Sequence, residues 1–127
     1  MTKQKSPKLT VEDHLKNAPQ CIVELFTVLD GKISDWNNVQ WKVRGNYIGY
    51  WFVSSIKKSK LFVEVHIQSK KVKLHIGNWD YKNPSGIIIT EVPDTHKWAL
   101  TKLVDLDSKS NIDSVINLVK QSYDNVL

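Results

Sequence analysis

Strict alternation of apolar and polar residues in the middle of the chain is the feature that most constrains the fold. Apolar side chains occupy every second position on either side of residues 69–70, namely Leu61, Val63, Val65, Ile67, Val72, Leu74 and Ile76. A period of two is typical of half-buried β-strands, and a two-residue loop joins them as a hairpin. In that register Glu64 lies opposite His75, and the two apolar rows share one face. The sequence therefore predicts antiparallel strands at residues 60–68 and 71–76.

A second hairpin is predicted immediately before the first. Residues 39–44 and 47–54 read as strands, and Gly45-Asn46 between them suits a tight type I′ or II′ turn. Directly opposed residues share a face, so the predicted buried set is Val39, Trp41, Val43, Ile48, Tyr50 and Phe52. Further along the chain we expect an edge strand at residues 87–90 and a fifth strand at residues 96–106.

Helices are predicted before and after the strands along the chain. Thr10 and Asp13 form a capping box that starts a helix near residue 11, and Pro19 interrupts that helix. A better helix is expected at residues 19–29, with Gly31 as its stop signal. A second capping box at residues 110–113 opens a C-terminal helix. The predicted fold class is α+β: an antiparallel meander of four to five strands with a broken N-terminal helix and a C-terminal helix.

Composition bounds the organisation of the chain. Its 127 residues, 41% hydrophobic, suffice for one domain, expected at residues 10–127 after a disordered basic tail at residues 1–9. No apolar run approaches a membrane span, and the N-terminus lacks a secretory signal. The single cysteine, Cys21, lies in an apolar helical pattern and is expected to be buried. A cytoplasmic protein with no membrane partner is the resulting prediction.

The polar face of the predicted sheet combines cations with aromatic rings. The formal net charge of +5 favours a polyanionic partner such as DNA or RNA. Single-stranded nucleic acid is held by such faces because bases stack on the rings and phosphates meet the cations. The predicted nucleic-acid-binding residues are Lys42, Arg44, Tyr47, Trp51, Phe62, Lys70, Lys71 and Lys73.

A second interpretation gives the same face to a protein partner. The aromatic rings can be covered by a helix, by another copy of the chain or by a larger protein, and lysines at hairpin turns protect against edge aggregation. A non-catalytic accessory or binding domain is common to both interpretations. A protein-interaction or homodimerisation domain is therefore the alternative to nucleic-acid binding.

A metal-dependent enzyme is the third hypothesis. Glu64 and His75 are cross-strand neighbours and His66 lies diagonally from His75, so the three side chains can converge as metal ligands or as an acid/base group. An exposed Glu–His pair beside lysines is more often a solvated salt-bridge face. The sequence contains no phosphate-binding glycine loop and no zinc-type Cys/His set. No catalytic residue is assigned, and no cofactor is expected.

The chain resembles a small bacterial domain family of unknown function. The resemblance is carried by the order and spacing of the segments TVEDHL, PQCIVELFTVLDGKI, NYIGYWF, LFVEVHIQSKKVKLHI and LVDLDSKSNIDSVINLVKQSYD. The family occurs alone or at the C-terminus of so-called predicted transport proteins, and some members accompany nuclease-type domains. Its usual His-Trp-Gly step before the last strand is replaced here by His96-Lys97-Trp98. The resemblance implies an accessory role, and its nuclease neighbours favour nucleic acid as the partner.

Overall fold

The computed structural model describes residues 10–56, 58–92, 100–107 and 111–127. The elements follow in the order α1 (Val11–Leu15), α2 (Gln20–Ser34), β1 (Val39–Val43), β2 (Ile48–Phe52), β3 (Lys60–Ile67), β4 (Val72–Ile76), β5 (Ile89–Glu91), β6 (Lys102–Leu106) and α3 (Ile112–Val126). The predicted basic tail, His96 and Ser110 lie outside the described residues.

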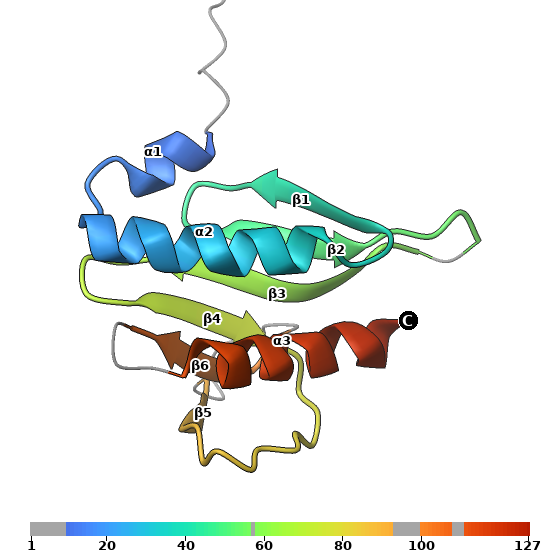
Figure 1. Cartoon of the computed structure of the whole chain (residues 1–127). Helices are drawn as coiled ribbons and strands as arrows, with labels where there is room; N and C mark the ends of the chain where they lie inside the picture. Colours follow the sequence, from blue (N-terminus) through green and yellow to red (C-terminus); the bar gives the residue numbers. More distant parts are fainter. Residues whose placement is uncertain (1–9, 57, 93–99, 108–110) are drawn as a thin grey trace, which may run out of the picture.

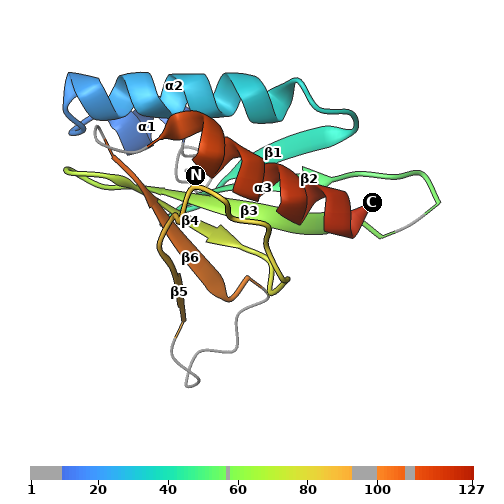
Figure 2. The same ribbon diagram turned by 60° about the horizontal axis from the view of Figure 1, so that its bottom comes forward.

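The strands form one antiparallel sheet of six strands in the order β1-β2-β3-β4-β6-β5. Figure 1 shows α2 and α3 on the same side of this sheet, and Figure 2 shows the two helices together as a second layer. The opposite face of the sheet, which we call the open face, carries no helix of the described residues. The predicted α+β class is confirmed.

The hydrophobic core lies between the sheet and the two long helices. The buried residues of α2 are Ile22, Phe26, Leu29 and Ile33, and those of α3 include Val115, Leu118, Val119 and Tyr123. On the sheet, alternate residues such as Ile48, Val65 and Leu74 are fully buried against them. Tyr50 points into the same layer and its hydroxyl donates a 2.7 Å hydrogen bond to Asp30 of α2. Burial and, to a smaller extent, this hydrogen bond raise the pKa of Tyr50.

The helix boundaries follow the predicted caps with two corrections. The Thr10–Asp13 capping box is present, and Pro19 is the N-cap residue of α2. Gly31 does not end α2, which continues to Ser34 because Ile33 is fully buried and anchors the last turn. The cap of α3 is Asn111, whose side-chain oxygen accepts a hydrogen bond from the Ser114 amide at 3.2 Å.

Both predicted hairpin registers are confirmed. In the first, Val39 pairs with Phe52 and Val43 with Ile48. In the second, Glu64 pairs with His75, as the alternation requires. The strand count and order differ from the prediction, because β6 pairs with β4 and the short β5 lies outside it as the edge strand. The part of the predicted fifth strand from residue 100 onward becomes a strand only at Lys102.

A β-bulge between β2 and β3 overturns the predicted position of Phe62. Tyr50 pairs with Val63 but Trp51 pairs with Leu61, so Phe62 is the extra residue. Its side chain is fully buried on the helix side, where its ring centroid lies 5.2 Å from that of Tyr123. The bulge lets a large ring enter the core without moving its neighbours out of it. Phe62 is therefore not on the open face.

Two further predictions of burial are wrong. Trp41 has the parity of the helix side but is 51% exposed, because β1 is an edge strand that the helices barely contact. Cys21 is exposed at the first turn of α2, whereas the next residue, Ile22, is buried. Within the described residues, the helices lack the combination of length and apolarity that a membrane span requires.

Candidate functional site on the open face of the sheet

The strand registers bring a continuous row of side chains together on the open face. Successive cross-strand partners form the row Lys42, Gly49, Glu64, His75, Leu103 and Thr90. An adjacent row contains His66, Lys73 and Asp105. A sheet that is packed on one side normally presents solvated polar groups on the other. Here the middle of the open face is instead shielded from solvent, since Glu64 is 5% and His75 is 7% exposed.

Glu64, His66 and His75 form a compact cluster at the centre of this face, which we call the Glu-His-His cluster. Glu64 and His66 are two residues apart on β3 and therefore point to the same side, and His75 lies opposite Glu64 on β4. His66 Nε2 lies 3.4 Å from Glu64 Oε1, and the imidazole centroids are 4.3 Å apart. One ligand atom from each residue lies within 4.8 Å of the other two. The convergence predicted from the sequence is present.

The electrostatic surroundings favour a neutral imidazole at His75. Burial lowers the pKa of His75 from its ordinary value of 6.5 to about 4. The nearby His66 and Lys73 act in the same direction, and the Glu64 carboxyl group opposes them. His75 is thus neutral at physiological pH, the form in which an imidazole nitrogen can accept a hydrogen bond or bind a metal.

Trp51 is the aromatic centre of the neighbouring part of the open face. The ring lies across Gly49, so close that a Cβ at residue 49 would stand 2.5 Å from Trp51 Cζ3. Lys42 Nζ lies 5.7 Å and Arg44 Cζ 5.9 Å from the ring centroid, within cation–π range. We call Lys42, Arg44 and Trp51 the cation–indole cluster.

Helix α1 and the β1–β2 turn hold Arg44 in place. Its amide donates to the Tyr47 carbonyl at 2.8 Å. Its carbonyl accepts a hydrogen bond from His14 Nε2 at 2.7 Å. Tyr47 in turn lies beside His66, with ring centroids 5.5 Å apart. No local spacing links His14 to this face, because the contact spans thirty residues.

The remaining predicted binding residues are distributed unevenly. Lys73 lies on the open face beside the Glu-His-His cluster, and Lys70 is exposed in the β3–β4 turn. Lys71 forms an ion pair with Asp105, at 3.0 Å between Nζ and Oδ2, so its charge is already opposed. With Phe62 in the core, Trp51 and Tyr47 are the two of the three predicted aromatic residues that lie on or beside the open face. The predicted surface is therefore smaller than expected and centred nearer β1 and β2.

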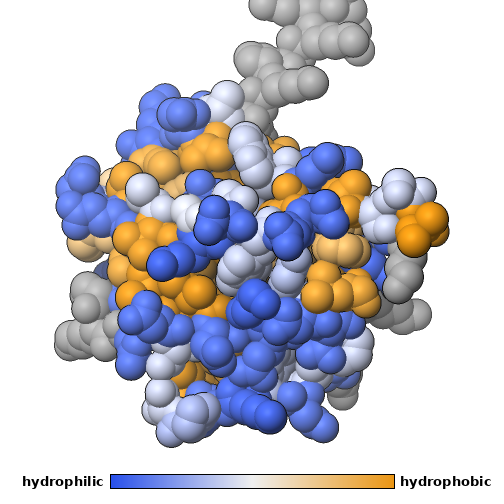
Figure 3. Space-filling view, turned by 45° about the vertical axis from the view of Figure 1, so that its right-hand side comes forward, coloured by the Kyte–Doolittle hydropathy of each residue, from blue (hydrophilic) through white to orange (hydrophobic). Residues whose placement is uncertain are grey.

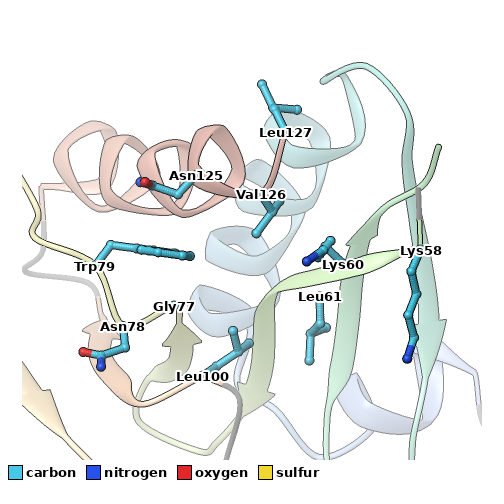
Figure 4. A pocket seen from close by; sticks show the side chains of 10 residues that line it. All are labelled: Lys58, Lys60, Leu61, Gly77, Asn78, Trp79, Leu100, Asn125, Val126 and Leu127. Carbon is cyan, nitrogen blue, oxygen red and sulfur yellow. The ribbon is translucent and has the colours of Figure 1, made fainter. Parts of the chain in front are cut away.

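A separate cavity of about 700 Å³ lies at the far end of α3. Figure 4 shows the Trp79 ring extending beneath Asn125 toward Val126, with Lys58 and Lys60 across the cavity. The Trp79 indole lies against Gly77, where an added Cβ would stand 2.2 Å from Nε1. The surface on this side is a mosaic of hydrophilic and hydrophobic residues (Figure 3). Sequence reasoning missed this cavity because residues from β3, the segment after β4, and α3 meet there only in the folded chain.

Comparison with known proteins identifies a family. The sequence profile described as Domain of unknown function (DUF5655) matches residues 11–126. No curated protein and no solved structure matches the chain at a significant level. The family match confirms the resemblance to a small domain family of unknown function. The chain belongs to the DUF5655 family.

Proposed function

We propose that this member of the DUF5655 family is a binding domain for single-stranded nucleic acid, and that it binds through the open face around Trp51. The observation that carries the proposal is the cation–indole cluster, in which Lys42 of β1 and Arg44 just after it both lie within cation–π range of one indole ring. Binding of single-stranded nucleic acid requires an aromatic ring on which a base can stack and a cation a few ångströms from that ring to contact the phosphate. Both groups are provided here by neighbouring strands of one sheet.

The interaction energies favour a nucleic-acid base over a cation as the partner of the Trp51 ring. An exposed cation–π contact stabilises by about 0.5–1 kcal/mol. A base stacked on an aromatic side chain contributes about 1–3 kcal/mol. A base can therefore displace Lys42 or Arg44 from the indole, and the released cation then meets the adjoining phosphate. The exposed positions of both cations allow this movement without unfolding any element.

Charge argues against a second copy of the chain as the partner of this face. Lys42 and Arg44 are exposed there and Lys73 lies half-buried beside the Glu-His-His cluster, so a two-fold interface would collect like charges. The burial of Phe62 in the core also removes one of the aromatic rings expected at such an interface. Burying unpaired cations in an interface is unfavourable.

Fluorescence anisotropy of a labelled oligothymidylate at about 50 and 200 mM salt tests the proposal. If Lys42, Arg44 and Lys73 each neutralise one phosphate, the affinity falls by about twentyfold over this fourfold increase in salt. Trp51→Ala weakens binding by about tenfold, as expected for one lost stacking contact.

Two control variants lie on the helix side of the molecule. Trp41→Ala removes an exposed tryptophan that lies on the other side of β1, and Lys32→Glu reverses an exposed charge of α2. Both should bind like the wild type. Equal binding by the wild type and Trp51→Ala refutes the proposal, as does absence of binding at low salt. Concentration-dependent self-association abolished by Trp51→Ala would assign the face to a protein partner instead.

A further inference from the structure

The Glu-His-His cluster has the composition of a metal site and lies beside the surface proposed for nucleic acid. We propose that Glu64, His66 and His75 bind one divalent transition-metal ion, with Zn²⁺ as the representative case. This site is independent of nucleic-acid binding, because none of its three ligands belongs to the cation–indole cluster.

The donor atoms suit zinc in kind and number. One carboxylate oxygen and two imidazole nitrogens form a common three-residue zinc set, which leaves a fourth position for water or another ligand. Soft or borderline divalent ions prefer imidazole, whereas Mg²⁺ and Ca²⁺ prefer all-oxygen sites. Two histidines among three ligands therefore select the transition metals over the hard cations.

The distances are close to those that zinc requires. Ligand atoms at about 2.0–2.1 Å from a tetrahedral ion are about 3.3 Å apart. Glu64 Oε1 and His66 Nε2 are already 3.4 Å apart. The whole set lies within 4.8 Å, so the ligand atoms need to approach one another by at most about 1.5 Å to reach the tetrahedral spacing.

The scaffold is preorganised for such a site. All three ligands come from β3 and β4, two central strands of the sheet whose pairing is continuous from Val63–Ile76 to Ile67–Val72. Glu64 and His75 are nearly inaccessible to solvent, and such ligands keep their rotamers without a bound ion. In a solvated salt-bridge face, which is the more common arrangement of an exposed Glu–His pair, two of the three side chains would not be buried.

Isothermal titration of tag-free protein with Zn²⁺ near neutral pH tests the site. The background protein carries Cys21→Ser, His14→Gln and His96→Gln, which removes every other cysteine and histidine of the chain. This background should bind one Zn²⁺ per chain. His66→Gln, added to it, should weaken binding by at least about 100-fold, since even outer-shell changes cost about 10–100-fold.

Cobalt(II) absorption gives a second readout that depends on coordination itself. The intense visible bands of low-coordinate Co²⁺ should appear with the background protein and be lost in Glu64→Gln and His66→Gln. His66 is partly exposed, so His66→Gln is expected to fold, and circular dichroism checks this. The proposal is overturned if the background protein binds no Zn²⁺ below millimolar concentration, or if folded His66→Gln binds it as tightly. Failure of oligothymidylate binding leaves this result unaffected.

Discussion

The pH dependence of stability reports directly on the burial of His75. In the metal-free protein the folded state holds this imidazole in its neutral form, because burial and the neighbouring His66 and Lys73 lower its pKa to about 4. The unfolded chain takes up the proton near pH 6.5. More protons are thus bound by the unfolded state between these two values, so stability rises with pH across this window. The contribution of the neutral His75 to the free energy of unfolding is complete above about pH 6.5 and is lost as the pH falls toward 4.

The expected loss follows from the two pKa values. Protonation of the unfolded chain at pH 5 favours unfolding by about 2 kcal/mol relative to pH 7.5, and full protonation at lower pH by about 3 kcal/mol. A domain of this size has about 5–15 kcal/mol of stability in total. The change is therefore large enough to shift an equilibrium unfolding midpoint clearly.

Urea unfolding followed by tryptophan fluorescence, in the presence of a chelator, measures this loss at pH 7.5 and pH 5. The wild type should lose about 2 kcal/mol more than His75→Gln between the two pH values. His14→Gln serves as the matched control, because His14 lies on α1 and should leave the wild-type difference intact. The difference between pH values is compared, so a uniform destabilisation by either variant does not matter. An equal loss in the wild type and His75→Gln would refute the burial argument.

Three stability predictions concern the rest of the fold, each measured by urea unfolding at neutral pH. Ser122→Ala should cost about 2–4 kcal/mol, because the buried Ser122 hydroxyl donates to the Phe62 carbonyl at 2.6 Å and accepts from the Gly77 amide at 3.0 Å. The half-exposed Ser114→Ala is its control, and a cost under about 0.5 kcal/mol at Ser122 would contradict the reasoning. Phe62→Ala should cost about 3–5 kcal/mol and Trp41→Ala less than about 1 kcal/mol, whereas the reverse order would place Phe62 on the surface. Gly31→Ala should stabilise the protein by about 0.5–1 kcal/mol, since Gly31 lies inside α2 with open space around its missing Cβ, and a loss of stability would show a contact that the structure lacks.

Local sequence patterns account for much of the fold. Alternation with a period of two determines which residues of β3 and β4 face the helices, and the two-residue turn determines their register. The position of Glu64 opposite His75 follows from these two facts alone. Capping works in the same local way, as the Thr10–Asp13 box demonstrates.

The corrections to the sheet involve contacts between residues far apart in the sequence. Phe62 enters the core through a bulge that is stabilised from α3, where Tyr123 contacts its ring and Ser122 binds its carbonyl. The segment after β4 runs along α3 and does not return directly to pair with β4, which leaves that edge of β4 to β6. Two hydrogen bonds between the Lys82 backbone and the Gln121 side chain of α3 hold this segment in place. Neither the bulge at Phe62 nor the position of β6 in the sheet produces a periodic pattern in the local sequence.

The candidate site was predictable only where its residues are close together in the sequence. The Glu-His-His cluster arises within one hairpin, so the sequence was sufficient to bring its members together. The burial of Glu64 and His75 depends on packing across the open face and could not be read from alternation, which predicts exposure there. The cation–indole cluster is also local to one hairpin, whereas the contact of His14 with Arg44 depends on how α1 meets the sheet.

Chemical-shift mapping of the isotope-labelled protein with an unlabelled single-stranded oligonucleotide locates the binding surface, because it reports on every amide at once. If nucleic acid binds on the open face, the largest shifts occur at Lys42, Gly49 and Lys73 and at the Trp51 indole, while α2 and α3 stay unchanged. Shifts confined to the helices, or no shifts at an excess of oligonucleotide, would rule out binding through the open face.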